Sequence, residues 1–255
     1  MLLAIDIGNS HIAAGCIDGT EITHIFRILT ERKKTADQYS VELKGIFDFN
    51  GVDCGVFDGA IISSVVPSIT PAMRESVQRL TGLSAVVVGA GIKTGLNIRI
   101  EDTAELGADA VCVSVAALAL YGAPCAIVDM GTATKILVLD DNGTYIGGAI
   151  APGVAISANA LTSRTSLLPS VSLDAPRKAV NGITTDAIKS GIVFGTAAMI
   201  DGMLQRFTKE LGYRPKAVAT GGLSSHIIPH CQEDIILDDT LILTGLRLLY
   251  EKNKK

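Results

Sequence analysis

The sequence predicts an α/β protein of two duplicated halves, each a mixed β-sheet flanked by helices, which face each other across a cleft. Three observations support this fold. Apolar segments of strand length alternate with amphipathic helical segments. An Asp-x-Gly turn follows an apolar strand twice, at Asp6 and at Asp129, which are 123 residues apart. The next turns, at Asp18 and Asn142, are 124 residues apart, so the repeat extends beyond one motif.

The first half begins with residues 2–10, an apolar strand that ends in a polar glycine turn. The residues that follow suit a hairpin, because Asp18-Gly19 separates two strand-like runs. Helical spacing of apolar residues and short buried runs then alternate. We expect further strands over 11–17, 21–28, 60–66 and 85–88, and helices over 35–49 and 70–80.

The second half repeats this order from residue 125. The uncharged stretch 110–128 resembles a membrane span in length, but Gly122 and Pro124 interrupt it, so we expect a buried helix, a turn and a strand. The domains are then expected to be residues 1–118 and 119–255. We also expect strands over 136–139, 145–150 and 216–220, and helices over 153–163, 185–211 and 240–250, with a break considered near Gly195.

Composition excludes several classes of protein. Of the 255 residues, 48% are hydrophobic, which excludes disorder as the dominant state. The formal net charge of −4 argues against a broad nucleic-acid surface. The five cysteines are odd in number and form no CxxC, so we expect reduced, mostly buried thiols. Asp6 interrupts the first apolar run, which argues against a signal peptide. We expect a cytoplasmic protein without a membrane partner.

The two Asp-x-Gly turns predict a phosphate site. Glycine lets the backbone approach a phosphate closely, and an aspartate can hold a metal ion or its waters. The side chains of Asn9, Ser10, Thr132 and Thr134 can donate hydrogen bonds to phosphate oxygens. One such turn is weak evidence, whereas two at equivalent places in a repeat are much stronger.

Phosphoryl transfer needs positioning, charge neutralisation and a group that accepts the hydroxyl proton. Asp109 is the candidate for this base, in the segment Gly107-Ala108-Asp109. A carboxylate that begins a helix is often only a cap. The preceding glycine and the position between the two halves favour a place in the predicted cleft.

Taken together, these features resemble type III pantothenate kinases, which belong to the actin and sugar-kinase superfamily. The resemblance covers nearly the whole chain and implies actin-like, ribonuclease-H-like halves. It rests on segments that are specific only jointly. These are Asp6-x-Gly8-Asn9-Ser10, 34–39, 62–67, 91–96, Gly107-Ala108-Asp109, Asp129-x-Gly131-Thr132-Ala133-Thr134, 147–153, Leu168-Pro169 and Ala219-Thr220-Gly221-Gly222.

The resemblance implies an ATP-dependent kinase that phosphorylates the hydroxyl of pantothenate, the first step of coenzyme A biosynthesis. It implies a homodimer with a shared active site, Mg²⁺ with the ATP and a monovalent cation, K⁺ or NH₄⁺. Asp109 would be the catalytic base, Asp129 would bind the monovalent cation, and Asp6 would bind metal. ATP would contact Asp6, Ile7, Gly8, Asn9, Ser10, His11, Ile12, Ala13 and Thr132. Pantothenate would contact Ile100, Gly107, Ala108, Asp109, Ala110 and, from the partner subunit, Thr184.

The departures from the family pattern fall mainly on the substrate side. Ala110 stands where the family has an arginine, which can bind a carboxylate through two charge-assisted hydrogen bonds. Ile100 replaces a tyrosine, and Lys135 replaces a common threonine. Thr103 also replaces a proline, and Ile183 an asparagine.

These departures leave three readings open. The chain is a pantothenate kinase in which another group, such as Lys135 or Arg99, replaces the missing arginine. Alternatively it is a kinase for a different small alcohol. The third reading is a nucleotide-binding, non-catalytic paralogue.

Overall fold

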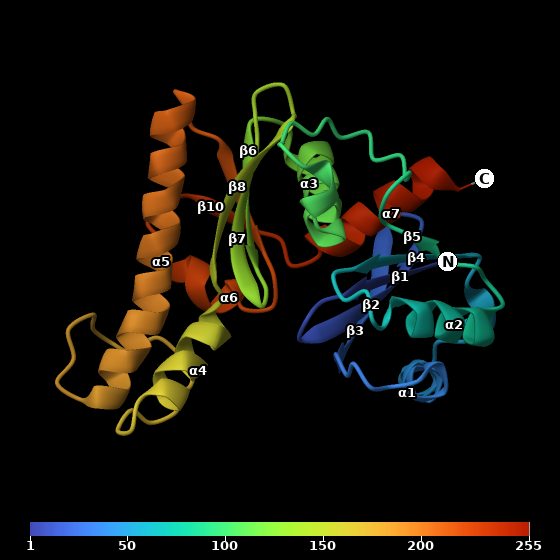
Figure 1. Ribbon diagram of the computed structural model, residues 1–255, viewed down its shortest axis with the longest axis horizontal. Helices are drawn as coiled ribbons and strands as arrows, with labels where there is room; N and C mark the ends of the chain where they lie inside the picture. The colour runs from blue at the N-terminus through green and yellow to red at the C-terminus, as the bar shows by residue number, and fades with distance from the viewer. Residues whose placement is uncertain (255) are drawn as a thin grey trace. The chain divides into compact units, whose positions relative to one another are not determined.

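The computed structural model describes residues 1–254 and contains two compact units (Figure 1). The first unit comprises residues 1–95, 102–116 and those from 241 onward. The second unit comprises residues 96–101 and 117–240. The predicted boundary between residues 118 and 119 stays a prediction.

The first unit is built on a five-stranded sheet in the order β3-β2-β1-β4-β5. The central strand β1 pairs antiparallel with β2 and parallel with β4. Its apolar run is buried, as expected for a central strand. The strands are β1 (Leu2–Ile7), β2 (His11–Asp18), β3 (Glu21–Leu29), β4 (Gly59–Ser64) and β5 (Val86–Val87). The helices of this unit are α1 (Ala36–Phe49), α2 (Thr70–Thr81), most of α3 (Ala108–Tyr121) and α7 (Leu241–Asn253), with short 3₁₀ turns at Cys54–Val56 and Thr103–Glu105.

The second unit repeats this plan with the order β10-β9-β6-β7-β8. Its central strand β6 pairs antiparallel with β7 and parallel with β9. The strands are β6 (Cys125–Met130), β7 (Ala133–Leu139), β8 (Tyr145–Pro152), β9 (Lys216–Thr220) and β10 (Ile235–Leu237). The helices are α4 (Val154–Arg164), α5 (Thr184–Leu211) and α6 (Ser224–Ile227), followed by a 3₁₀ turn at Ile228–His230.

The two sheets therefore have the same topology. In each, the central strand has an antiparallel neighbour on one side and a parallel neighbour on the other. β1 corresponds to β6, β2 to β7, β3 to β8, β4 to β9 and β5 to β10. The predicted duplication of a mixed sheet flanked by helices is confirmed.

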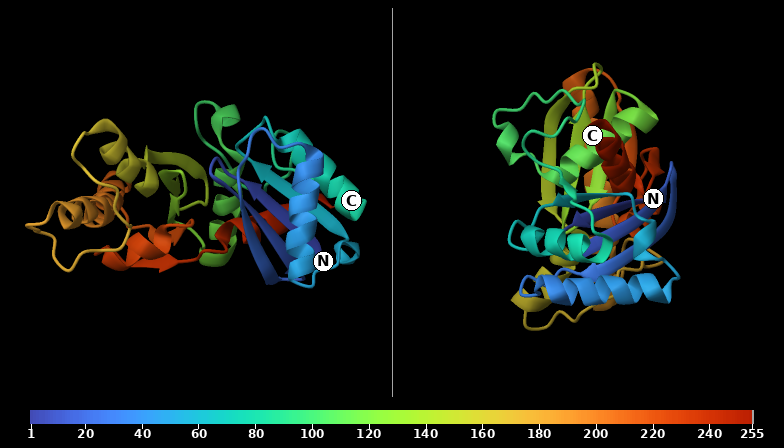
Figure 2. Two further views of the ribbon diagram at one scale, coloured as in Figure 1. Left: turned by 90° about the horizontal axis from the view of Figure 1, so that it is seen from below. Right: turned by 90° about the vertical axis from the view of Figure 1, so that its right-hand side faces the viewer.

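Helices α1 and α2 cover one face of the first sheet (Figures 1 and 2). Leu3, Ile5 and Ile7 point to this face and pack in one cluster with side chains of both helices, among them Tyr39 and Met73. Because side chains alternate along a strand, Asp6 points to the opposite face. The candidate aspartate is thus kept out of this apolar core.

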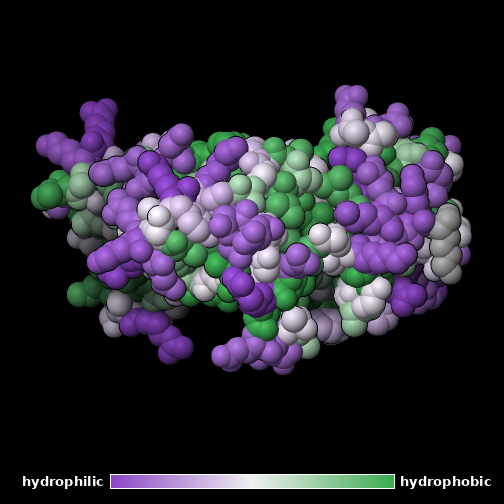
Figure 3. All heavy atoms as spheres, turned by 90° about the horizontal axis from the view of Figure 1, so that it is seen from above, coloured by the Kyte–Doolittle hydropathy of each residue, from purple (hydrophilic) through white to green (hydrophobic). Residues whose placement is uncertain are grey.

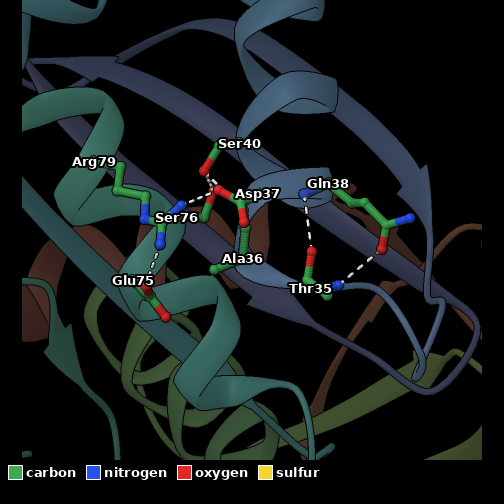
Figure 4. A network of polar contacts seen from close by, with 8 residues as sticks. All are labelled: Thr35, Ala36, Asp37, Gln38, Ser40, Glu75, Ser76 and Arg79. Carbon is green, nitrogen blue, oxygen red and sulfur yellow. Dashed lines mark hydrogen bonds and ion pairs between the residues drawn. The ribbon is translucent and has the colours of Figure 1, made fainter.

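Polar contacts fix the position of α1 beside α2 (Figure 4). Thr35 and Gln38 form a capping box at the start of α1. Arg79 of α2 contacts Asp37 of α1 and its own neighbour Glu75. These contacts lie away from the candidate residues, so they support the scaffold.

The opposite face of the first sheet is covered by α7, which packs on β1 and β4. Helix α7 also approaches α3 closely, because a methyl group added at Gly245 would lie 2.0 Å from the carbonyl oxygen of Cys112. Only glycine allows this spacing between the two backbones. Asp6 therefore points to the face of the sheet that α7 covers.

In the second unit, α5 covers one face of the sheet. Ala126, Val128 and Met130 of β6 pack with the α5 residues Ile192 and Ala197 in one cluster. Asp129 lies between them in sequence and so points to the other face. Both candidate aspartates therefore occupy equivalent places in their sheets.

Helix α5 has 28 residues and is long and apolar enough to cross a membrane by length and composition alone. Almost half of its most apolar window, 44%, is buried inside the protein. The core helices of water-soluble proteins pass the same test. This helix is accounted for by its packing on the second sheet.

Most of the expected elements are present, with two differences. Helix α5 is continuous through Gly195, where the sequence leaves a break open. The short elements α6 and β10 were not predicted, because each has fewer than five residues and no clear period. The stretch 110–128 forms a helix, a turn and a strand as predicted. In Figure 3, hydrophilic side chains cover much of one face with apolar ones between them.

Candidate functional site

The first Asp-x-Gly turn joins β1 to β2. The Gly8 N–H donates to the carbonyl oxygen of His11 at 3.0 Å, which closes the turn. Thr30, directly after β3, supports the turn, since its hydroxyl donates to the Gly8 carbonyl oxygen at 2.7 Å. Asn9, Ser10 and His11 are exposed, whereas Ile7 and Ile12 are buried. Among the residues of this segment that are predicted to contact ATP, the side chains of Asn9, Ser10 and His11 are therefore accessible to a ligand.

Asp6 lies on the central strand, between Ala13 of β2 and Ser63 of β4 in the ladder. The residues opposite it on the two adjacent strands are thus uncharged. The carboxylate is half-buried.

Asp109 lies in the first turn of α3, directly after the segment that begins at Gly107. Its Oδ1 accepts a hydrogen bond from the Ala110 N–H at 2.7 Å. The carboxylate folds back over Gly107, where an added methyl group would lie 2.6 Å from this oxygen. The structural reason for a glycine two residues before the aspartate is therefore space for the carboxylate.

The pKa of the Cys112 thiol depends on the charges of both Asp6 and Asp109. Burial is the main cause that raises the pKa of this thiol well above its ordinary value. The negative charges of Asp6 and Asp109 raise the pKa further. The carboxylates of Asp6 on strand β1 and Asp109 on helix α3 thus both act electrostatically on this thiol, and they make the region acidic.

The glycine of the second Asp-x-Gly turn also donates a backbone hydrogen bond forward along the chain. The Gly131 N–H donates to the carbonyl oxygen of Ala133 at 3.1 Å. Asp129 lies opposite Lys135 of β7 and opposite Thr220 of β9. Its Oδ2 is 2.7 Å from the Lys135 Nζ, and the two side chains are only 13% and 16% exposed. A largely buried ion pair thus stands where the first unit has Asp6 beside Ala13.

Two glycines let the backbone approach the turn that carries Thr132. A methyl group added at Gly153 would lie 2.2 Å from the Thr132 carbonyl oxygen, and one at Gly221 would lie 2.5 Å from that of Met130. Gly153 is also the N-cap of α4, and the N-terminus of a helix favours anions. The sequence alone gives neither glycine a role, although both fall in the segments that carry the family resemblance.

The structure divides the predicted substrate contacts between the two units. Gly107, Ala108, Asp109 and Ala110 belong to the first unit at the start of α3, whereas Ile100 and Thr184 belong to the second. Ala110 is 4% exposed, so the missing arginine does not leave an open surface pocket. Thr184 is exposed at the first residue of α5.

Both cations that we considered as replacements for that arginine contact carboxylates of their own unit. Arg99 is 3.0 Å from Asp140, whose other oxygen accepts hydrogen bonds from the N–H groups of Asn142 and Thr144. Asp140 is 7% exposed, so Arg99 balances a buried charge. Lys135 contacts Asp129 in the same way.

The residues fit a divalent ion that arrives with a nucleotide better than a resident metal. Within residues 1–254 there is no group of three or more His, Cys, Asp or Glu residues that could hold a metal ion. Mg²⁺ is usually bound by one or two carboxylates together with substrate phosphates, which suits Asp6 and its acidic region. A monovalent cation at Asp129 does not fit this arrangement, because the ammonium of Lys135 already contacts that carboxylate.

Comparison with known proteins decides the family. The family model described as type III pantothenate kinase matches residues 2–206. The chain belongs to this family. A type III pantothenate kinase from an Exiguobacterium species is 40% identical over 255 residues, covering 100% of both chains. Members of the family are kinases, so the chain is a phosphotransferase.

Solved structures support the fold of this pantothenate kinase family member. A putative Baf family transcriptional activator from Campylobacter jejuni is 19% identical with a TM-score of 0.62, covering 98% of each chain. A putative 2-dehydro-3-deoxygalactonokinase from Sinorhizobium meliloti is 12% identical with a TM-score of 0.56, covering 100% of this chain and 97% of its own. At these identities the similarity concerns the fold alone, and it agrees with the predicted actin-like and sugar-kinase class.

Proposed function

We propose that this chain transfers the γ-phosphoryl group of ATP to the hydroxyl of pantothenate, giving the phosphate ester and ADP. The observation that carries the proposal is the pair formed by Asp109 and Gly107 at the start of α3. The glycine leaves space for the carboxylate, whose Oδ1 is held by the Ala110 N–H. Within a family of kinases, a carboxylate held in this way suits a group that accepts the hydroxyl proton.

Asp109 would take the proton of the attacking alcohol. The hydroxyl oxygen of the alcohol would form the new bond to the γ-phosphorus, while the bond from that phosphorus to the oxygen that leaves with ADP breaks. The turn at Gly8 would hold phosphate oxygens through the exposed polar groups of Asn9 and Ser10, and Thr132 would do so in the second unit. Mg²⁺ bound with ATP would neutralise phosphate charge, and Asp6 is the residue that would hold it. Phosphoryl transfer needs little more from a protein than these functions.

The identity of the alcohol depends on how the acid end of the substrate is bound. Ala110 offers no cation, and Arg99 and Lys135 contact Asp140 and Asp129. This observation favours a second candidate, a kinase for a small alcohol that lacks a carboxylate at this place. Family membership favours pantothenate, and we propose it as the first acceptor.

We also propose a cytoplasmic homodimer in which Thr184 reaches the partner's substrate. Support for a dimer comes from the family resemblance and from exposed apolar side chains close to this residue in sequence: Ile183 is 64% exposed and Val180 88%. The five cysteines are free thiols, which suits a reducing compartment. Light scattering of the purified chain tests the dimer.

The experiment that tests the function is ADP release with ATP and Mg²⁺, measured with and without pantothenate. We expect pantothenate-dependent release and a phosphorylated product identified by mass spectrometry. A matched assay replaces pantothenate with pantothenol, in which an alcohol replaces the carboxylate. Turnover of pantothenol alone supports the second candidate, whereas ATP binding without turnover of any alcohol contradicts a kinase.

A further inference from the structure

Lys135 and Asp129 lie directly opposite each other on β7 and β6. The Nζ and Oδ2 atoms are 2.7 Å apart, and neither side chain is more than 16% exposed. By contrast, the Lys189–Asp174 pair has a similar distance of 2.8 Å, but its aspartate is 65% exposed. The pair at Asp129 is therefore largely shielded from water on both sides.

The register of the sheet fixes this pair. Met130 faces Thr134 and Val128 faces Ile136, so Asp129 and Lys135 share one face of the ladder. A slip of one residue would turn the whole strand over and bury the wrong side chains. Directly opposed residues on one face have Cβ atoms about 5 Å apart, which a lysine side chain spans easily. The contact thus follows from strand pairing and from the lysine at this position.

A single positive charge is what the Asp129 carboxylate requires. A carboxylate removed from water is costly unless it is paired, and the ammonium of Lys135 supplies that partner. A monovalent cation on the same carboxylate would lie close to the ammonium, where two like charges repel with little screening by solvent. The lysine and a bound K⁺ therefore compete for one position.

We propose that the Lys135 ammonium permanently takes the place of a monovalent cation at Asp129, so that this chain needs neither K⁺ nor NH₄⁺ to transfer a phosphoryl group. The inference rests on the proposed function for its activity readout. A tethered ammonium cannot dissociate, so the charge at Asp129 is independent of the salt in solution. A threonine at position 135, by contrast, leaves the carboxylate to an ion from solution.

The first test compares the chain and Lys135→Thr in NaCl, KCl and NH₄Cl at equal ionic strength. We expect the unaltered chain to release ADP at rates that agree within about two-fold in all three salts, because the positive charge at Asp129 belongs to the Lys135 side chain. Lys135→Thr should lose at least about ten-fold in NaCl and recover in KCl or NH₄Cl. Lys189→Thr is the matched control, and its activity should not depend on the salt.

The second test does not depend on activity. The unaltered chain should unfold at the same Tm in NaCl and in KCl. The Tm of Lys135→Thr should be roughly 2–4 °C higher in saturating KCl than in NaCl. If no alcohol is phosphorylated, this comparison still tests the cation site and separates its failure from that of the proposed function.

Several results would overturn the inference. One is a rate in KCl at least ten times that in NaCl for the unaltered chain, or a rise of its Tm specific to KCl. Another is a Lys135→Thr variant that no salt restores, with a raised KM for pantothenate, which would assign Lys135 to the substrate. If the variant does not fold, the two measurements on the unaltered chain decide.

Discussion

The two Asp-x-Gly turns have similar backbone arrangements but differ in the charge of the residue opposite the aspartate. In both, the glycine N–H donates to a carbonyl oxygen two or three residues on, at 3.0 Å and 3.1 Å, and the aspartate lies on the central strand of an equivalent sheet. Opposite Asp6 stands Ala13, whereas opposite Asp129 stands Lys135. The Asp129 carboxylate forms an ion pair with this lysine.

The same backbone arrangement can therefore place an aspartate in two different electrostatic environments. In the first unit, burial and then the negative charges of Asp6 and Asp109 raise the pKa of Cys112. In the second unit, the ammonium of Lys135 pairs with the Asp129 carboxylate. The predictions below test this contrast, beginning with the largest effect.

Replacement of Asp109 should have the largest effect. Asp109→Asn keeps the size of the side chain but removes the proton acceptor, so kcat should fall by on the order of 10²–10⁴-fold. ATP binding, measured by calorimetry, should remain nearly unchanged. Asp102→Asn, in the same segment, is the control and should keep full activity. Unchanged turnover of Asp109→Asn would remove this residue from the mechanism.

Gly107→Ala tests the position of the same carboxylate. The added methyl group would lie 2.6 Å from Oδ1 of Asp109, so the carboxylate must move. We expect kcat to fall by roughly 10²-fold, as for a misplaced catalytic group, with little change in Tm. Gly89→Ala, where an added methyl group contacts nothing, is the control. A variant as active as the unaltered chain would mean that the carboxylate does not need this position.

Aspartates in a buried and in an exposed ion pair should differ in their effect on stability. Asp129→Asn removes the negative charge from the largely buried pair with Lys135, so the free energy of unfolding should fall by about 1–3 kcal/mol. Asp174→Asn removes it from the pair with Lys189, in which the aspartate is 65% exposed, so the loss should be much smaller. Urea unfolding of both variants measures the difference. Equal losses in the two variants would break the contrast.

Stability should fall in alkaline solution. Burial raises the pKa of Cys125 to about 11 and that of Cys112 well above its ordinary value of 9.0. In the unfolded chain each thiol loses its proton near pH 9, whereas the folded chain retains it. The stabilisation is therefore complete below pH 9 and is lost as the pH rises through the folded pKa, by at most about 1.4 kcal/mol per unit for each thiol. Urea unfolding at pH 8 and 10.5 checks this, and equal free energies would contradict it.

Much of the fold could be predicted because it depends on local patterns. The alternating strands and the two Asp-x-Gly turns, 123 residues apart, are visible in the sequence and correspond to the two sheets. The contact between Lys135 and Asp129 depends on which residues the ladder places opposite each other. The space that Gly107 leaves for Asp109, and the approach of Gly153 to Thr132, depend on backbone packing that composition does not encode.

One measurement tests the central claim most directly: pantothenate-dependent ADP release with ATP and Mg²⁺ in NaCl alone, beside the same assay in KCl. The account predicts phosphorylated pantothenate at similar rates in both salts, because Asp109 accepts the proton and Lys135 supplies the charge at Asp129. Release in KCl alone would contradict the role of Lys135. No release in either salt, with ATP bound, would contradict the kinase activity on pantothenate.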